Sequence, residues 1–230
     1  MLRFDAFEAL GVACAAFSEK SDGNLARDAC DDDLRSFCDA CGVATLDLAL
    51  VRQVHSNRVV VADPPGETSS EGPVDLGEAD ALIGGAPGVV LGIRAADCVP
   101  IYLFDPASGA VGLIHAGRAG TLQGIVKQTV KEMELKYGTH PRAIHALVGP
   151  SAGPCCYEVS PELAKECESK GLTIAGRNVD LWESNARQLL EWGIPAAQTT
   201  VCGLCTICDG RFHSHRAESN AGRNLALLAL

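Results

Sequence analysis

Cys98 and His115 stand at the two outer ends of an apolar stretch that has a turn signal in its middle. If residues 105–108 form a loop between antiparallel strands, the two residues face each other across the ladder. Directly opposed residues have Cα atoms roughly 4.5–5.5 Å apart, so a thiolate and an imidazole there can bind one ion. Sulfur with imidazole nitrogen suits zinc best. The alternative is a buried cysteine and a core histidine that never meet.

His55, at the end of another apolar run, is the best candidate for a third ligand. A zinc site with three protein ligands keeps a fourth position for water or substrate, which is typical of catalytic zinc. We therefore predict a metal site formed by His55, Cys98 and His115, with Cys98 also in the catalytic set. The same residues fit a different chemistry, in which Cys98 is the nucleophile of a cysteine hydrolase or amidase and His115 is its base.

Asp97, next to Cys98, and Glu158 are the predicted catalytic carboxylates. The alternative for Asp97 is turn capping or a hydrogen bond to a metal-binding histidine. Arg118 lies in a Gly-Arg-Ala-Gly segment before a helix that we expect to begin near Thr121. Free backbone N–H groups and the helix dipole favour an anion there, and Arg118 adds charge-assisted donors. The alternative is that the glycines serve only a tight strand-to-helix turn.

A second group of cysteines has metal-site spacing. Cys202, Cys205 and Cys208 form a C-x2-C-x2-C pattern, to which Cys155 or Cys156 can add a fourth thiolate. This pattern is found in structural zinc sites and iron–sulfur proteins, although three sulfurs alone are incomplete. A metal-stabilised binding module is therefore a further alternative for the chain.

The elements that must position these residues alternate between strand and helix signals. Apolar, β-branched runs predict strands, the first two of them flanking a hairpin-like turn, over residues 48–54, 58–62, 88–94, 99–104, 110–114 and 144–149. Apolar spacing and capping residues predict helices around 34–41, over 121–137, and after Ser160 and Asp180. Residues 62–80, rich in Pro, Gly, Ser and acids, predict a long surface loop. We expect one α+β domain over residues 1–230, with mixed β-sheets flanked by helices.

The composition excludes several classes of partner. The chain has 230 residues, of which 47% are hydrophobic, and a net charge of −10. An acidic chain without a basic run is a poor candidate for binding nucleic acid or an anionic membrane. No apolar run approaches the roughly 20 residues that span a bilayer, and the N-terminal segment does not resemble a signal peptide. Eleven cysteines, an odd number, favour reduced thiols and a cytoplasmic location, as a monomer or small homo-oligomer.

Several ordered motifs together resemble the YfiH-like family, also called laccase-domain or polyphenol oxidase proteins. The resemblance extends from Asn24 to Arg223. It rests on Gln53-Val54-His55, Ala79-Asp80-Ala81-Leu82-Ile83, Asp97-Cys98-Val99-Pro100, His115-Ala116-Gly117, Val148-Gly149-Pro150-Ser151, Cys156-Tyr157-Glu158-Val159, Cys205-Thr206, Phe212-x-Ser214 and Gly222-Arg223. It implies that His55, Cys98 and His115 bind one zinc, and that Asn24 and Arg118 bind substrate.

The resemblance also implies an activity: phosphorolysis of adenosine, inosine, guanosine or methylthioadenosine, with some deamination of adenosine. Zinc lowers the pKa of bound water toward about 7, which suits a deaminase assisted by a carboxylate. Two departures affect substrate preference, since Arg118-Ala119 replaces the family's Trp-Arg and residues 214–217 read Ser-His-Arg-Ala rather than Ser-Tyr-Arg-Arg.

Two other activities stay open as alternatives. One is an amidase that edits cell-wall precursors, with zinc or with the cysteine as nucleophile. The other is a laccase-like polyphenol oxidase. Six histidines with a single His-x-His pair, His213 and His215, are too few in one chain for a multicopper oxidase.

Overall fold

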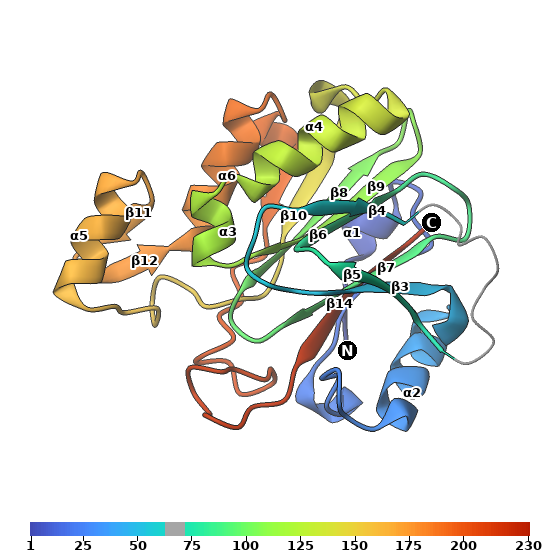
Figure 1. Ribbon diagram of the computed structural model, residues 1–230, viewed down its shortest axis with the longest axis horizontal. Helices are drawn as coiled ribbons and strands as arrows, with labels where there is room; N and C mark the ends of the chain where they lie inside the picture. The colour runs from blue at the N-terminus through green and yellow to red at the C-terminus, as the bar shows by residue number, and fades with distance from the viewer. Residues whose placement is uncertain (63–71) are drawn as a thin grey trace.

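The computed structural model describes residues 1–62 and 72–230 (Figure 1). In this part of the chain, the long strands form two six-stranded sheets. The first sheet has, in spatial order, β1 (Leu2–Arg3), β2 (Cys14–Phe17), β14 (Asn224–Ala229), β7 (Val90–Ala95), β3 (Leu48–Arg52) and β5 (Val74–Glu78). The second has β13 (Thr199–Val201), β10 (His145–Val148), β8 (Val99–Asp105), β9 (Ala110–Ala116), β6 (Ala81–Gly84) and β4 (Val59–Val61). Both sheets are mixed, since each contains parallel and antiparallel pairs.

Helices cover the outer faces of the two sheets, and a small ribbon extends from one end. The ribbon pairs β11 (Thr173–Ala175) with β12 (Asn178–Asp180). The α-helices are α1 (Asp5–Glu8), α2 (Asp31–Cys41), α3 (Arg118–Leu122), α4 (Ile125–Tyr137), α5 (Pro161–Ser169) and α6 (Leu181–Glu191). Short 3-10 turns cover Lys20–Asp22, Thr45–Asp47, Pro141–Ala143 and Ala196–Gln198. In Figure 1, α2 lies on one side of the strands and α4 and α6 lie on the other. The predicted α+β fold with mixed sheets flanked by helices is confirmed.

The order of layers follows from the alternation of side chains along the central strands. In β6, Leu82 faces the first sheet, whereas Ala81 and Ile83 face the helices. The helix-facing side packs against Ile125, Val130 and other apolar residues of α4. All residues of β6, β8 and β9 are buried because both faces of these strands are covered. The second sheet is therefore a rigid central layer, and the residues that follow its strand ends are held firmly.

The structure confirms the three helices predicted from caps and spacing. Ser160 accepts a hydrogen bond from the backbone of Leu163 at the start of α5, and Asp180 accepts one from Glu183 at the start of α6. On α2, the predicted apolar face is buried against the first sheet. The remaining helix differs, because Gly124 adopts a left-handed conformation and divides the predicted 121–137 helix into α3 and α4.

Two strand predictions were wrong. Strands β3 and β4 do not form a hairpin: β3 pairs in parallel with β5 and β7 in the first sheet, whereas β4 pairs with β6 in the second. The segment between them crosses from one sheet to the other. The predicted 62–80 loop contains β5, which pairs in parallel with β3 and keeps Val74 and Leu76 half-buried. The part of that prediction over residues 63–71 lies outside the described residues.

Candidate metal centre and adjoining pockets

The β8–β9 hairpin brings Cys98 and His115 together, but its register differs by two residues from the prediction. Pro100 pairs with His115, so Cys98 lies just before β8 rather than opposite His115. The loop covers residues 106–109, because Gly109 adopts a left-handed φ of 74° and donates to the Asp105 carbonyl. Only a residue that tolerates positive φ closes the turn there. Cys98 is therefore diagonal to His115 and near Gly117.

Three predicted ligands nevertheless converge. The His55 Nε2 and Cys98 Sγ atoms are 3.9 Å apart, and the His55 and His115 ring centroids are 5.0 Å apart. One ligand atom from each of His55, Cys98 and His115 lies within 4.8 Å of the other two. His55 comes from the crossing between the two sheets, and His115 from the C-terminal end of β9. The donor set of two imidazoles and one thiol fits a single transition-metal ion with an open position.

Asp80, to which we assigned no role from the sequence, is the residue that organises these ligands. Its carboxylate is fully buried and accepts a 2.9 Å hydrogen bond from His115 Nδ1. It also accepts from the backbone N–H of His55 at 3.0 Å and from the N–H and hydroxyl of Ser56. Holding Nδ1 in this way points Nε2 of His115 toward the metal position. Asp80, not Asp97, is thus the carboxylate that orients a histidine of the candidate ligand set.

Backbone strain is concentrated beside the centre. His55 has φ of 60° and Asp97 has φ of 88°, which are uncommon values for residues with a side chain. The His55 conformation is held by Asp80 on its N–H and by Gln123, whose side chain donates to the His55 carbonyl at 3.0 Å. Such strain persists only where the surrounding contacts determine it, as happens at functional sites.

Charge coupling within the triad favours a thiolate. Burial raises the pKa of the Cys98 thiol, but the adjacent His115 and His55 outweigh it and bring that pKa to about 6. Burial lowers the pKa of His115, whereas Cys98 and Asp80 raise it to a net value of about 9. A thiolate is the form of cysteine that binds metals and attacks electrophiles, so Cys98 is suited to either role.

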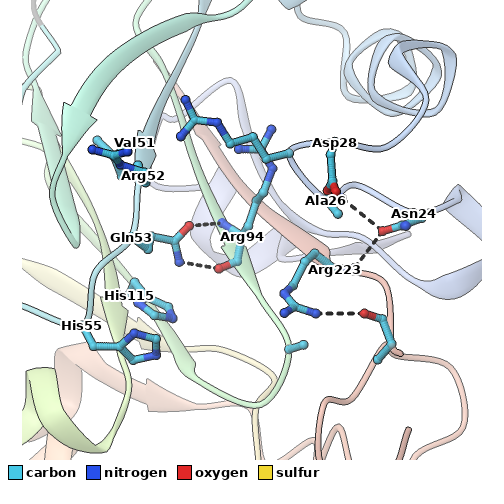
Figure 2. Close-up of a pocket in the computed structure, with 13 residues that line it drawn as sticks. Asn24, Ala26, Asp28, Val51, Arg52, Gln53, His55, Arg94, His115 and Arg223 are labelled. Atoms are coloured by element: carbon cyan, nitrogen blue, oxygen red, sulfur yellow. Dashed lines mark hydrogen bonds between the residues drawn. The ribbon is translucent and has the colours of Figure 1, made fainter. Parts of the chain in front are cut away.

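Two cavities meet at this centre. The larger, of about 500 Å³, is lined by His55, His115, Ala96 and a group of polar residues that includes Asn24, Gln53, Arg94 and Arg223. Figure 2 shows His55 and His115 together at one end of this cavity, with the polar residues along its walls. The smaller, of about 380 Å³, is lined by Cys98, Ala96, Arg118, Tyr157, Arg216 and others. Ala96 lines both, so the cavities adjoin beside the ligands.

The predicted substrate-binding residues fall in different cavities. Asn24 lies in the larger one, where its Oδ1 accepts from the backbone N–H groups of Ala26 and Arg223. Arg118 lies in the smaller one, which Tyr157 also lines. Sequence reasoning missed Tyr157 and Arg216 as lining residues, although both stand in or beside motifs singled out above.

Both predicted catalytic carboxylates already have hydrogen-bond or ion-pair partners within the protein. Asp97 lines the smaller cavity, but its Oδ1 accepts from Thr206 at 2.7 Å and its Oδ2 from the Arg216 N–H at 2.7 Å. Glu158 is exposed, and its carboxylate pairs with Arg177. Catalytic roles for Asp97 and Glu158 therefore stay predictions.

The glycines of the Gly-Arg-Ala-Gly segment, residues 117–120, let the backbone approach neighbouring groups closely. Helix α3 begins at Arg118 rather than near Thr121, with Gly117 as its N-cap. A Cβ on Gly117 would stand 2.7 Å from Cys98 Sγ, and one on Gly120 would stand 3.3 Å from the Ser56 carbonyl oxygen. Because α3 has only five residues, its dipole adds little for an anion. The glycines serve tight packing, and anion binding by Arg118 stays a prediction that rests on its charge.

The fold and the site together define a class of protein: a two-sheet α+β fold with a candidate His-Cys-His metal site next to a cavity lined in part by Arg118 and Arg216. Residues 21–230 match the family model described as multi-copper polyphenol oxidoreductase laccase, and the chain belongs to this family, as its motifs predicted. No helix in the described residues is long and apolar enough to cross a membrane.

Similar proteins carry a consistent name. The chain is 37% identical over 198 residues to a purine nucleoside phosphorylase of Deinococcus radiodurans, covering 83% of this chain and 73% of that protein. It is 32% identical over 194 residues to the enzyme of that name from Bacteroides thetaiotaomicron, covering 78% and 72%. Among solved structures, YlmD from Geobacillus stearothermophilus superposes with a TM-score of 0.81 at 27% identity, covering 94% and 91%.

Proposed function

We propose that the protein is a zinc-dependent purine nucleoside phosphorylase acting on adenosine, inosine, guanosine or methylthioadenosine in the cytoplasm. In this reaction a phosphate oxygen forms a bond to C1′ of the sugar while the C1′–N9 bond breaks. The electron pair goes to the purine, which takes a proton and leaves as the free base, and the sugar is released as its 1-phosphate. The relatives named purine nucleoside phosphorylase support the assignment of the reaction.

The observation that carries the proposal is the pair of cavities that adjoin at the ligands. In a displacement at C1′, the attacking oxygen and the leaving nitrogen lie on opposite sides of the carbon. The cavity lined by Arg118 supplies a cation for phosphate, and the cavity lined by Asn24 takes the nucleoside. The sugar then lies between them, beside the three ligands.

Zinc is the metal we propose because a buried carboxylate orients one of two imidazoles beside a thiolate. When bound, zinc would act as a Lewis acid and fix the position of a polar substrate atom. The remaining roles belong to side chains and backbone of the protein itself. Asp80 holds His115, Gly117 lets the backbone pass close to Cys98, and Arg118 binds the anion.

The test is product analysis with each nucleoside in the presence and absence of inorganic phosphate. We expect free base and sugar 1-phosphate only when phosphate is added. Arg118→Ala should raise the KM for phosphate about tenfold, since a charge-assisted hydrogen bond contributes about 1.5–3 kcal/mol. Arg35→Ala, on the exposed side of α2, is the matched control and should leave KM unchanged. Base release without phosphate would overturn the proposal.

We propose deamination of adenosine as a minor activity, with Asp97 as the carboxylate nearest to Cys98 in the same cavity. Phosphate-independent formation of inosine, reduced in Asp97→Asn, is the expected signature. Glu158→Gln is the parallel test of the second carboxylate.

The activated Cys98 thiol supports a second candidate, an amidase. Zinc bound in equal amount to the chain and lost in Cys98→Ala would exclude a free cysteine nucleophile. A purified protein that contains zinc but turns over no nucleoside would favour a zinc amidase. Oxidation of phenols by copper-loaded protein is the corresponding test of the oxidase.

A further inference from the structure

A second group of thiols lies outside the His55–Cys98–His115 centre. Cys155, Cys156, Cys205 and Cys208 each place a sulfur within 4.8 Å of the other three. Cys202, which the sequence pattern grouped with Cys205 and Cys208, is not among them. It follows β13, where its N–H donates to the Val148 carbonyl, and its side chain packs against the apolar layer between the sheets. Both Cys155 and Cys156 take part instead.

The spacing of the sulfurs fits a shared metal ion better than a disulfide. In a tetrahedral zinc site with Zn–S distances of about 2.3 Å, neighbouring sulfurs are about 3.8 Å apart. A disulfide requires about 2.05 Å. The Sγ atoms of Cys155 and Cys208 are 3.9 Å apart. We propose that these four cysteines bind one zinc ion in a tetrathiolate site, distinct from the His-Cys-His centre.

Backbone hydrogen bonds hold the four thiols in place without a metal ion. The N–H of Gly153 donates to Cys205 Sγ at 3.3 Å, and the N–H groups of Ile207 and Cys208 also face that sulfur. Such donors stabilise a thiolate. The two segments are joined by their own hydrogen bonds, since Ser151 N–H donates to the Leu204 carbonyl and Thr206 N–H donates to the Ser151 carbonyl. The four thiols are therefore gathered at low entropic cost.

The site connects two walls of the smaller cavity. Tyr157 directly follows the first pair of cysteines, and Arg216 lies on the segment that follows the second pair. The Arg216 guanidinium is 5.4 Å from the Tyr157 ring centroid and donates to the Glu158 carbonyl. Thr206, between Cys205 and Cys208, donates to Asp97. A metal ion bound by all four sulfurs would fix both walls relative to Cys98.

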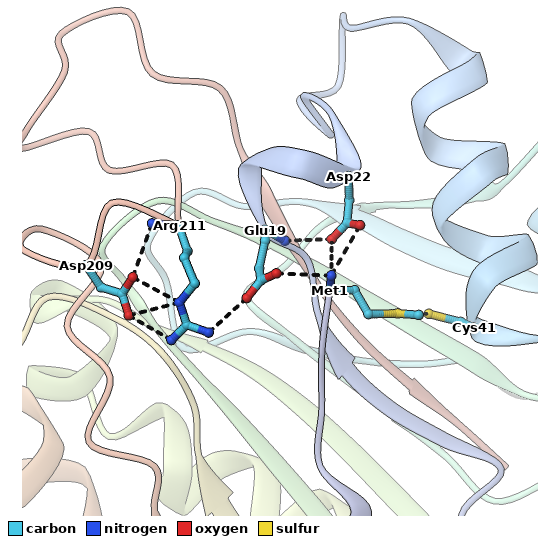
Figure 3. Close-up of polar contacts among 6 residues, drawn as sticks. All are labelled: Met1, Glu19, Asp22, Cys41, Asp209 and Arg211. Carbon is cyan, nitrogen blue, oxygen red and sulfur yellow. Dashed lines mark hydrogen bonds and ion pairs between the residues drawn. The ribbon is translucent and has the colours of Figure 1, made fainter.

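The segment beyond Cys208 is anchored at its other side. Arg211 pairs with Asp209 and with Glu19, and Glu19 also pairs with the N-terminal ammonium of Met1 (Figure 3). These contacts tie the start of the segment, directly after Cys208, to the N-terminal part of the chain without the cysteines. Loss of the zinc should therefore loosen the cavity wall and leave the rest of the fold in place.

The decisive experiment counts zinc per chain by native mass spectrometry on protein purified under reducing conditions. Wild type should hold two ions, and His55→Ala/His115→Ala should keep one. Cys155→Ser/Cys208→Ser should lose one, whereas Cys30→Ser/Cys202→Ser, which removes two thiols outside the cluster, should keep both. Retention of two ions by Cys155→Ser/Cys208→Ser, iron in place of zinc, or a Cys155–Cys208 disulfide would overturn the proposal.

A second measurement does not depend on the cysteine variants folding. His55→Ala/His115→Ala loaded with Co²⁺ should show the intense thiolate-to-cobalt charge-transfer and visible bands of a tetrahedral tetrathiolate. A spectrum of weak octahedral cobalt bands would contradict the site. Because this variant lacks the first centre, neither outcome depends on the proposed phosphorylase activity.

Discussion

Asp80 shows how one buried carboxylate can hold three candidate metal ligands together. It touches both histidines, through His115 Nδ1 and the backbone of His55, and it fixes the turn at Ser56. Burial raises the pKa of Asp80, but hydrogen bonds from His115 and Ser56 lower it to about 2, so it is ionised at neutral pH. Asp80 thus joins three segments that are distant along the chain, those that contain His55, Asp80 itself and His115.

The first prediction concerns this residue. Asp80→Asn should lower zinc affinity at the His-Cys-His centre by about 10–100-fold, because partners of ligating histidines contribute on this scale. The measurement is chelator competition monitored by mass spectrometry. Asp105→Asn is the matched control, as Asp105 is equally buried but lies at the far end of β8. Equal zinc affinity in Asp80→Asn and Asp105→Asn would contradict the role given to Asp80.

Gly117 offers a steric test of the same centre. A methyl group at this position would collide with Cys98 Sγ, so Gly117→Ala should displace the ligand by a fraction of an ångström. We expect phosphorolysis to fall by about 100-fold, the loss that misplacement near 1 Å can cause, and zinc affinity to fall with it. Gly210→Ala, where a methyl group would meet nothing within 4 Å, should leave both unchanged. If Gly117→Ala bound zinc with the affinity of the wild type, the centre would tolerate the displacement of Cys98 and the prediction would be wrong.

The ligands were predictable from sequence because their chemistry is rare, whereas their supports were not. Thiol and imidazole side chains at strand ends are the residue types that a metal site needs, His55 was the best third candidate at the end of another apolar run, and the family motifs supported all three. Asp80 lies among apolar residues with no partner visible in the sequence, because Ser56 reaches it only through the parallel pairing of β4 with β6, and His115 only through the antiparallel pairing of β6 with β9. Non-local pairing of this kind leaves no local pattern.

At the scale of elements, a single turn residue decides which residues meet. The β8–β9 register is set by Gly109, whose left-handed conformation places the loop one residue later than symmetry about residues 105–108 suggests. Likewise, β3 and β4 look like a hairpin in sequence, but parallel partners separate them into different sheets. Apolar runs predicted β3, β4, β7, β8, β9 and β10, missed β5 within the predicted loop, and could not predict which strands pair.

The Gly109 turn can be tested directly. Gly109→Ala should destabilise the protein by about 1–2 kcal/mol, the cost of a left-handed conformation for a residue with a Cβ. A Cβ there would meet nothing within 4 Å, so the cost is one of backbone conformation and not of packing. Urea unfolding measures it, with Gly210→Ala as the control. A loss within error of zero would show that the loop can close in another register.

At the scale of the whole molecule, the two sheets share one apolar layer. Tyr102, on the second sheet, donates to the Ala16 carbonyl on the first at 2.7 Å and is fully buried. Leu82, also on the second sheet, packs in the same layer as Leu91 of the first. Helices close the outer faces on either side. The candidate metal centre lies where the chain crosses between the sheets, so its geometry depends on their packing.

This arrangement predicts a single cooperative unit over residues 1–230. Leu82→Ala should lower the free energy of unfolding by about 2–5 kcal/mol, as expected for a fully buried leucine. Because the lost contacts belong to both sheets, unfolding followed by far-ultraviolet circular dichroism and by tryptophan fluorescence should shift together. Leu135→Ala, on the exposed face of α4 with 83% of the side chain accessible, should change stability by no more than about 0.5 kcal/mol. Two separated transitions in Leu82→Ala would show that the sheets unfold independently, and the metal centre would then lie between two domains instead of within one.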